Sequence, residues 1–341
     1  MKVGIPSFVF YSTAFLILMM MIIVSSFFFL GNNTLLYTAQ AHTATIQVGM
    51  FPFGIAYDPS NDNIYVANPV SSTVSVISGS TNSVTATTLV GRAPFSLVYV
   101  PSNNQIYVTN LLSNDVYVIS GVTNRVVKAI AVGSQPIGIA YDSTNNSVYV
   151  ANSANNTVSV INAATDAVIS TIPLGSSSGI GSTSDSTRPI FLTYDNDNEG
   201  LYVSKDPSAV SIINSITNAA VDDITVEGTP SGIAYNPTNH NIYVGRFDSN
   251  QVSVINTITN SVIGNIAVGT NPIGIVYNPI NHNMYVTNQG LNTVSVIDST
   301  TNSVIGNIPA GSLPTGIAYD SANNHIYVTN RDSNTVTMIH P

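Results

Sequence analysis

Residues 136–175 read PIGIAYDSTNNSVYVANSANNTVSVINAATDAVISTIPLG. Four short apolar runs rich in Val, Ile, Thr and Tyr occur in this stretch, at Ile137–Tyr141, Val148–Ala151, Thr157–Ile161 and Val168–Leu174. Clusters of Asn, Ser, Asp and Gly separate the runs, and this pattern is typical of strands joined by tight turns rather than of helices. The stretch therefore predicts a four-stranded antiparallel sheet.

The stretch belongs to a repeat that fills the chain from residue 52 onward. Seven copies start at a proline, with spacings of 42, 42, 53, 41, 42 and 42 residues: Pro52, Pro94, Pro136, Pro189, Pro230, Pro272 and Pro314. The longest spacing carries eleven extra residues between Gly175 and Pro189. Four antiparallel strands in a repeat of about 40 residues form the blade of a β-propeller. The chain has no Trp, which argues against the WD40 type.

The way the ring closes can also be predicted. The seventh copy stops at Val336–Ile339, after three strands. Its missing fourth strand, which elsewhere ends in I-x-V-G, occurs before the first copy as Ile46-Gln47-Val48-Gly49. Pairing of this N-terminal strand with the last copy hides two sheet edges that would otherwise promote aggregation. We therefore expect an all-β, seven-bladed propeller closed by its N-terminal strand.

Composition excludes several classes of protein. The 341 residues include 8 basic and 17 acidic side chains, giving a net charge of −9, and only 7% are charged. A negative chain lacks the basic surface that nucleic-acid binding requires, so we expect no nucleic-acid partner. The absence of Cys excludes disulfides, thiol catalysis and Cys-ligated metals.

The N-terminus differs from the rest of the chain. Val9 to Leu30 is almost uninterruptedly apolar, and its 22 residues are enough to cross a membrane as one helix. Ala39-Gln40-Ala41 resembles a signal-peptide cleavage site. Residues 1–41 are therefore predicted to form either an uncleaved membrane anchor or a cleaved signal, with the propeller domain over 42–341. Both interpretations place the propeller outside the cytoplasmic membrane, anchored at the cell surface or secreted.

Three copies share a four-residue motif: Tyr107-Val108-Thr109-Asn110, Tyr285-Val286-Thr287-Asn288 and Tyr327-Val328-Thr329-Asn330. On this motif the chain resembles the YVTN family of β-propeller repeats, and is similar to archaeal surface-layer proteins and exported propellers of the YncE type. The resemblance covers about residues 42–341 and implies an extracytoplasmic propeller, often in an adhesion or scaffold role. It carries no shared catalytic motif. The fourth and fifth copies depart from the motif at Lys205 and Arg246.

Residues present in every copy are best explained by structure, because a ligand site has one location. Fourteen of the 17 Tyr occupy two fixed positions per copy, and we expect them to pack between blades and sheets. The repeated Asn residues are expected to form hydrogen bonds in turns and loops. His240 and His282, which occupy equivalent turns, are expected to be exposed. Function should therefore be sought where the repeat is broken.

In a propeller, the loops that enter strand 1 and those that join strands 2 and 3 share one rim, called here the upper rim. Several departures from the repeat fall there in the fourth and fifth copies. An aromatic side chain with cations at the channel mouth would hold an anionic or carbohydrate-like ligand. The candidate binding residues are Arg92, Arg188, Phe191, Lys205, Arg246 and Arg331. The alternative is that Lys205–Asp206 and Arg246–Asp248 are solvated ion pairs of little consequence.

The loops joining strands 1 to 2 and 3 to 4 share the lower rim, which is expected to be acidic and free of basic residues, with Arg125 and Lys128 on an outer strand. Asp195-Asn196-Asp197-Asn198-Glu199-Gly200 resembles the first half of a calcium loop. Asp195, Asp197 and Glu199 are therefore candidate ligands of Ca²⁺. An acidic β-turn is the alternative interpretation.

These features predict a non-enzymatic extracytoplasmic module that binds a cell-envelope protein or glycan, and that contacts the membrane through its N-terminal segment if this is uncleaved. No nucleophile elbow, H-E-x-x-H or phosphate loop occurs. Because fold does not fix function, an extracytoplasmic enzyme of the lyase or lactonase type remains an alternative. Clustered His and carboxylates at one end of the channel would favour it. A structural surface-layer component is the third possibility.

Overall fold

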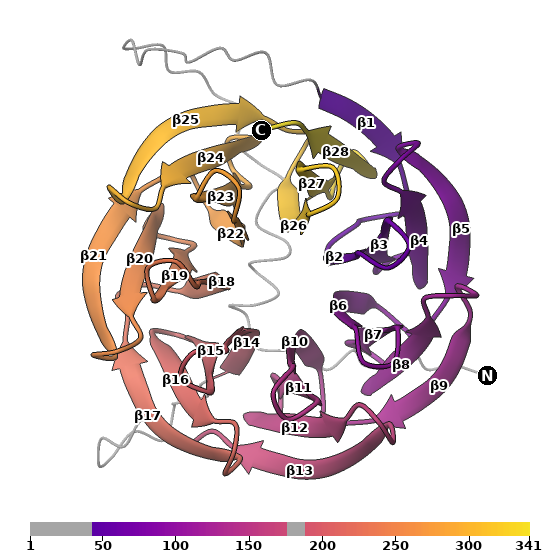
Figure 1. Cartoon of the computed structure of the whole chain (residues 1–341), viewed down its shortest axis with the longest axis horizontal. Coiled ribbons are helices and arrows are strands. Elements are labelled where there is room, and N and C mark those ends of the chain that lie inside the picture. Colours follow the sequence, from indigo (N-terminus) through magenta and orange to yellow (C-terminus); the bar gives the residue numbers. More distant parts are fainter. Residues whose placement is uncertain (1–42, 176–187) are drawn as a thin grey trace, which may run out of the picture. The chain divides into compact units, whose positions relative to one another are not determined.

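A computed structural model describes residues 43–175 and 188–341. The described residues form seven four-stranded antiparallel sheets arranged as blades around a central channel (Figure 1). The prediction of an all-β, seven-bladed propeller is therefore confirmed. The expected N-terminal helix and the boundary at residue 41 fall outside the described residues. Within the described part of the chain, no helix has the length and apolarity needed to span a membrane.

The first three blades have the following strands. Blade 1 contains β2 (Ile55–Asp58), β3 (Asn63–Asn68), β4 (Thr73–Ser78) and β5 (Ser83–Leu89). Blade 2 contains β6 (Pro94–Val100), β7 (Gln105–Asn110), β8 (Asp115–Ser120) and β9 (Val126–Ala131). Blade 3 contains β10 (Pro136–Asp142), β11 (Ser147–Asn152), β12 (Thr157–Asn162) and β13 (Ala167–Pro173).

The other four blades repeat this order. Blade 4 contains β14 (Arg188–Asp195), β15 (Gly200–Asp206), β16 (Ala209–Asn214) and β17 (Ala219–Thr225). Blade 5 contains β18 (Pro230–Asn236), β19 (Asn241–Arg246), β20 (Gln251–Asn256) and β21 (Ser261–Ala267). Blade 6 contains β22 (Pro272–Asn278), β23 (Asn283–Asn288), β24 (Thr293–Asp298) and β25 (Ser303–Pro309). Blade 7 contains β26 (Pro314–Asp320), β27 (His325–Asn330), β28 (Thr335–Ile339) and the N-terminal β1 (Thr43–Gln47).

The ring closes as the sequence predicts. β1 pairs antiparallel with β28 over five residues, from Thr43 opposite Ile339 to Gln47 opposite Thr335. Ile46 of β1 is buried and packs against side chains of blades 1 and 7. The first and last described strands therefore share one sheet (Figure 1).

Asparagine is abundant because the turns need it. Most turns between strands place one residue in the left-handed region, with φ near +55°, just before the next strand begins. Asn and Asp tolerate this conformation better than other residues with a side chain. Asn146, Asn156 and Asp166 fill these positions in blade 3, and His240 and His282 fill the corresponding position in blades 5 and 6. These two histidines are therefore turn residues, as expected.

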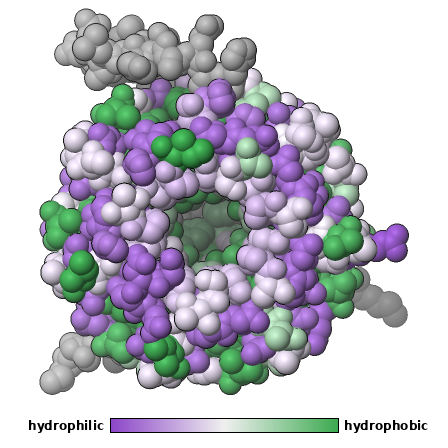
Figure 2. Space-filling view, in the orientation of Figure 1, coloured by the Kyte–Doolittle hydropathy of each residue, from purple (hydrophilic) through white to green (hydrophobic). Residues whose placement is uncertain are grey.

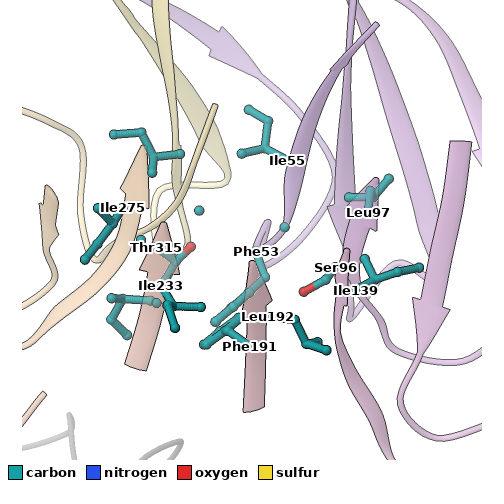
Figure 3. Close-up of a pocket in the computed structure, with 16 residues that line it drawn as sticks. Phe53, Ile55, Ser96, Leu97, Ile139, Phe191, Leu192, Ile233, Ile275 and Thr315 are labelled. Atoms are coloured by element: carbon teal, nitrogen blue, oxygen red, sulfur yellow. The ribbon is translucent and has the colours of Figure 1, made fainter. Parts of the chain in front are cut away.

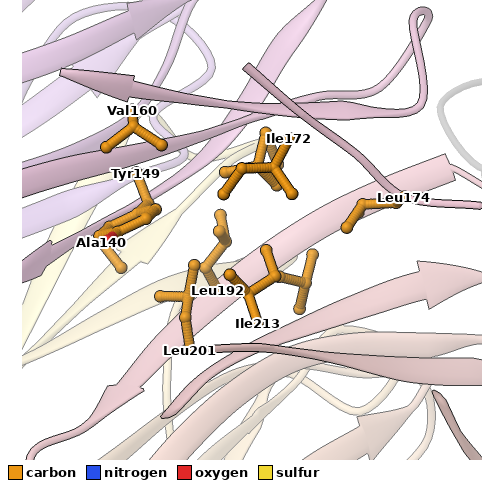
Figure 4. Close-up of a cluster of buried hydrophobic side chains, with 11 residues drawn as sticks. Ala140, Tyr149, Val160, Ile172, Leu174, Leu192, Leu201 and Ile213 are labelled. Carbon is orange, nitrogen blue, oxygen red and sulfur yellow. The ribbon is translucent and has the colours of Figure 1, made fainter. Parts of the chain in front are cut away.

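The hydrophobic core lies between neighbouring blades. In one cluster Tyr149, Val160 and Ile172 of blade 3 pack against Leu201 and Ile213 of blade 4 (Figure 4). Similar clusters join the other pairs of neighbouring blades. Each blade therefore buries both faces only when its neighbours are present, which explains why a closed ring is needed.

Candidate functional site

The tyrosines of strand 2 link the blades and do not form a ligand site. All seven are buried, and six donate a hydrogen bond to an Asn or Asp in the turn joining strands 3 and 4 of the next blade. Tyr149, for example, donates to Asn218 Oδ1 at 3.0 Å. Burial raises the pKa of Tyr149 to about 12, so the hydroxyl keeps the proton that it donates. The expectation that repeated tyrosines pack between blades is confirmed for this set.

The Thr and Asn of the YVTN motif also have structural roles, because they form hydrogen bonds between and within blades. Thr109 Oγ1 donates to the carbonyl of Ile137 in the next blade at 2.8 Å, and Thr329 Oγ1 donates to the carbonyl of Phe53 at 2.7 Å. The Asn that follows is buried and bonds strand 3 of its own blade, as when Asn288 Nδ2 donates to Ser295 Oγ at 2.8 Å. The motif is therefore a pair of structural links.

Lys205 does not lie on the upper rim. Its side chain is buried within blade 4, and its Nζ is 2.8 Å from Asp223 Oδ2 on the outer strand β17. Ser211 Oγ donates a second hydrogen bond to the same carboxylate. The expected pair with Asp206 is wrong, because the side chain runs across its own sheet to Asp223. Asp223, which the sequence analysis missed, is the only acidic residue at its position among the copies.

Arg246 is also buried, within blade 5. Its Nη1 donates to Gln251 Oε1 at 2.8 Å and to Asn265 Oδ1 at 3.2 Å. Its ionic partner is the exposed Glu227 at 3.3 Å rather than Asp248, which accepts hydrogen bonds from Thr229. Lys205 and Arg246 therefore make polar contacts within their own sheets.

The other three cations do reach the upper rim. Arg92 is exposed in the loop entering blade 2. Arg188 begins β14 opposite Asp206, whose pKa is raised by burial and lowered in part by this guanidinium. The Arg331 guanidinium lies over the Phe51 ring, 5.3 Å from its centroid. These residues come from blades 2, 4 and 7, so the structure does not gather the predicted residues into one site.

Phe191 lies in the channel together with two rings that the sequence analysis missed. Its ring is nearly parallel to that of Phe53, with 6.5 Å between centroids, and it is 6.5 Å from that of Phe95. Phe53 and Phe95 are 4.1 Å apart. Phe53 and Phe95 replace Ile, Ser or Thr one residue after the leading proline, so a position-by-position comparison of the copies would have revealed them.

Below the aromatic rings the channel wall is aliphatic. Strand 1 of every blade contributes one residue to it: Ile55, Leu97, Ile139, Leu192, Ile233, Ile275 and Ile317. Together with Phe53 and Phe191 they line a cavity of about 140 Å³ (Figure 3). Figure 2 shows the opening of the channel, with hydrophobic side chains inside it and mostly hydrophilic residues around it.

Glycine allows the strands around the channel to approach one another. The Gly54 amide donates to the Phe95 carbonyl at 2.9 Å, and a Cβ at Gly54 would lie 2.3 Å from that oxygen. Glycine occupies this position in five blades, and Ser96 and Phe191 replace it in the other two. The direct backbone contact explains why the repeat keeps glycine here.

The acidic residues of the lower rim mainly stabilise their own turns. Asp195 Oδ1 accepts the Asp197 amide at 2.9 Å, and Asp58, Asp142 and Asp320 act in the same way. Glu199 supplies the left-handed residue of its turn. No group of three or more His, Asp or Glu side chains among the described residues is placed to hold a metal. Calcium binding by Asp195, Asp197 and Glu199 therefore gains no support from their geometry.

The lower rim carries one basic residue that was not expected there. The prediction that Arg125 lies on an outer strand is wrong, because β9 begins at Val126 and Arg125 lies in the preceding loop. Asp197 accepts a hydrogen bond from Tyr235 and lies 3.2 Å from His240 Nδ1. This His–carboxylate pair is about half exposed on both sides.

Side chains of the upper-rim loops change from blade to blade. The loops joining strands 2 and 3 read NPVSST, NLLSND, NSANNT, KDPSA, RFDSNQ, NQGLNT and NRDSNT in blades 1 to 7. The second residue of this loop is different in every blade, and the third is exposed in every blade. The loops joining strands 3 and 4 change in kind chiefly at their third position, reading SGSTNS, SGVTNR, NAATDA, NSITNA, NTITNS and DSTTNS in blades 1 to 6.

Comparison with known proteins places the chain among propellers without fixing an activity. Residues 134–161 match the model of the NHL repeat. No curated protein matches the sequence. Hydrazine synthase from Kuenenia stuttgartiensis is a similar solved structure, with a TM-score of 0.74, 20% identity, and coverage of 85% of this chain and 96% of that chain. In all, 1748 solved chains match. Because so many proteins share the fold, the likeness describes architecture alone.

Proposed function

We propose that this propeller is a non-enzymatic binding module outside the cytoplasmic membrane, and that its upper rim contacts a cell-envelope protein or glycan. One observation carries the proposal: the upper-rim loops repeat in seven blades, but their exposed side chains change from blade to blade. The third loop residue, which is exposed in every blade, is Val70, Leu112, Ala154, Pro207, Asp248, Gly290 and Asp332 in blades 1 to 7. Variation of exposed residues on a constant backbone is expected of a recognition surface.

The upper-rim loops are held in place by hydrogen bonds. The Met50 amide donates to Ser71 Oγ at 2.7 Å, and the Arg92 amide donates to Ser113 Oγ at 3.0 Å. The Phe51 amide donates to Asn334 Oδ1 at 2.8 Å and so ties blade 1 to blade 7. A surface that is already ordered loses little entropy when it binds.

The loops of blades 7, 1 and 2 combine apolar and cationic groups. Val70 and Leu112 are 57% and 53% exposed at equivalent positions. Arg331 over Phe51 and the exposed Arg92 add two positive charges. An aromatic face beside guanidinium groups suits an acidic glycan or an acidic loop of a protein. This sector replaces blades 4 and 5 as the preferred contact, because Lys205 and Arg246 are buried.

The experiment exchanges side chains between blades. Val70→Ala, Leu112→Ala and Arg331→Ser together give three loops the residues that blade 3 carries at Ala154 and Ser153. We expect the triple variant to keep its melting temperature and to lose at least tenfold in affinity for isolated cell envelope, measured by co-sedimentation.

The matched control makes equivalent substitutions in lower-rim loops, again replacing each residue with the one found in blade 3. Val122→Ala, Ile216→Ala and Ile258→Ala introduce the residue that blade 3 carries at Ala164. Envelope binding should be unchanged in this control. Equal binding by both triple variants and the wild-type protein would contradict the proposal for the upper rim.

Export is the second element of the proposal. It is supported by the apolar run from Val9 to Leu30 and by the resemblance to exported YVTN propellers. Fractionation of the source cells, with N-terminal sequencing of the mature protein, tests it. An N-terminus at His42 would indicate cleavage after Ala41, and an intact N-terminus in the membrane fraction would indicate an anchor. Recovery from the cytoplasm would refute export.

The lyase or lactonase alternative is supported less well. It requires clustered His and carboxylates at one end of the channel. The described residues offer the pair Asp197–His240, which is half exposed and lies beside Tyr235, and His325, which lies near His340, Asp320 and Asp62. The corresponding Tyr277 in blade 6 contacts His282 in the same way without a carboxylate partner, so the pair follows from the turn sequence.

A further inference from the structure

We propose that the channel cavity is a binding site for a small apolar ligand about the size of one benzene ring. This inference is independent of the rim function, because it concerns residues inside the ring. The cavity of about 140 Å³ is lined by one aliphatic side chain from each of the seven blades and by the rings of Phe53 and Phe191 (Figure 3).

The lining favours an apolar occupant over water. Among the described residues, no charged side chain lines the cavity, and the hydroxyl-bearing residues that line it are Ser96 and Thr315. Thr315 Oγ1 already lies 2.9 Å from Thr329 Oγ1 and donates to the Pro52 carbonyl. A buried water needs two to four polar partners, and an apolar cavity of about 150 Å³ in another protein stays dry and binds benzene. This cavity has a similar volume and is lined mainly by aliphatic and aromatic side chains, but it opens to the channel, and glycine backbone, Ser96 and Thr315 also line it.

The three phenylalanines depart from the repeat, and Phe191 also packs against the hydrophobic cluster between blades 4 and 5. They come from blades 1, 2 and 4, whereas the repeat keeps Ile, Ser or Thr at positions 53 and 95 and Gly at position 191. Their rings nevertheless meet in the channel, within 6.5 Å of one another. Aromatic rings offer flat faces on which a planar apolar ligand packs with an offset or edge-on geometry. Two of these aromatic departures from the repeat, Phe53 and Phe191, thus line a cavity to which strand 1 of every blade contributes.

The test uses benzene as the probe and the purified propeller as the protein. Benzene near its aqueous saturation should raise the melting temperature by about 2–4 °C, since a ligand that binds only the folded state stabilises it. Ile275→Phe fills the cavity and should abolish this shift. Ile263→Phe, the same change on the exposed outer strand β21, should leave it intact.

A second measurement locates the ligand and does not depend on the folding of any variant. Crystals of the wild-type protein under xenon pressure should show xenon between Phe191 and the aliphatic ring. Xenon density in the channel together with a benzene shift that Ile275→Phe removes would support the proposal. A melting temperature that benzene does not change, a benzene shift that persists in Ile275→Phe, or a channel without xenon would overturn it.

Discussion

Blade 7 and the six continuous blades hold their outer strands in different ways. In blades 1 to 6 a turn joins strands 3 and 4, and its Asn or Asp accepts a hydrogen bond from the preceding blade's tyrosine. In blade 7 the outer strand β1 comes from the other end of the chain, and no turn joins it to β28. Tyr285, which precedes this blade, is the one strand-2 tyrosine without such an acceptor among the described residues; its hydroxyl accepts the Asn281 amide at 2.8 Å.

The difference separates two kinds of stabilisation. Strand pairing and apolar burial act in all seven blades, whereas the tyrosine-to-turn bonds act at six of the seven junctions. The junction between blades 6 and 7 lacks the tyrosine bond and keeps other hydrogen bonds, such as that from Thr287 Oγ1 to the Thr315 carbonyl at 2.7 Å and that from Asn278 Nδ2 to Asn324 Oδ1 at 3.0 Å. Since the closing strand is not covalently joined to β28, this blade is where opening of the ring should begin.

The largest effect should follow removal of the closing strand. Deleting residues 43–48 exposes the edge of β28 and uncovers the core that Ile46 completes. An unpaired edge in a ring that must close favours aggregation. We expect the melting temperature of the propeller to fall by more than about 10 °C, and light scattering to show oligomers. Equal melting temperatures and equal monodispersity with and without β1 would show that closure is unimportant.

A smaller effect is expected inside a continuous blade, at the pair of Lys205 and Asp223. Asp223→Asn leaves the buried Lys205 ammonium without its counter-charge and should cost about 2 kcal/mol of unfolding free energy. In blade 6 the equivalent positions hold the uncharged residues Asn288, Ser295 and Asn307, which are joined by hydrogen bonds. The double variant Lys205→Asn with Asp223→Asn reproduces that arrangement and should recover most of the loss.

Chemical denaturation of both single variants and the double variant gives the coupling between the two residues. Lys205→Asn alone should also destabilise, because Asp223 loses its cation while its side chain is only 32% exposed. Additive losses in the double variant would mean that the ion pair does not act as a unit.

The next largest effect is expected at the strand-2 tyrosines, where two variants compare a junction that has the tyrosine bond with the junction that lacks it. Tyr149→Phe removes the hydrogen bond to Asn218 and should cost about 1 kcal/mol. Tyr285→Phe removes a hydroxyl of equal burial that makes no such bond to the next blade, so its cost should be less than half as large. Both tyrosine hydroxyls also accept a hydrogen bond from an Asn amide of their own blade, at 3.1 and 2.8 Å. Both variants lose this bond, so it does not contribute to the difference between them. Equal losses of unfolding free energy would show that the turn acceptors contribute nothing.

The strands and turns of the blades could be predicted from sequence because the residues that form them recur at a fixed spacing. The apolar runs of the third copy match β10 to β13 within one residue at every end, and Ile46-Gln47-Val48-Gly49 identified the strand that closes blade 7. Seven copies reduce the effect of any single ambiguous residue.

The candidate site was harder to predict because it depends on contacts that are distant in sequence. Lys205 lies on β15 and Asp223 lies on β17, with β16 between them. Their pairing can therefore be predicted only when the register of all three strands is known. Phe53, Phe95 and Phe191 meet only because strands 1 of all blades converge on the channel. A solvent-exposed Lys and a buried one look alike in sequence unless the copies are compared position by position, which shows an acid at residue 223 only in blade 4.

The smallest effect concerns the response of blade 7 to pH. Burial lowers the pKa of the His325 imidazole below its usual 6.5, and the nearby His340 acts in the same direction, while Asp320 and Asp62 oppose it. As pH falls from 7 to 5, the unfolded chain therefore takes up this proton before the folded ring does, and folding stability is lost. Asn occupies the same position in blades 1, 5 and 6, so His325→Asn is a change that the fold already tolerates. The wild-type protein should lose a few degrees more in melting temperature than this variant over that range. Parallel melting curves at pH 7 and pH 5 for the two proteins would show that His325 does not couple the closing blade to protonation.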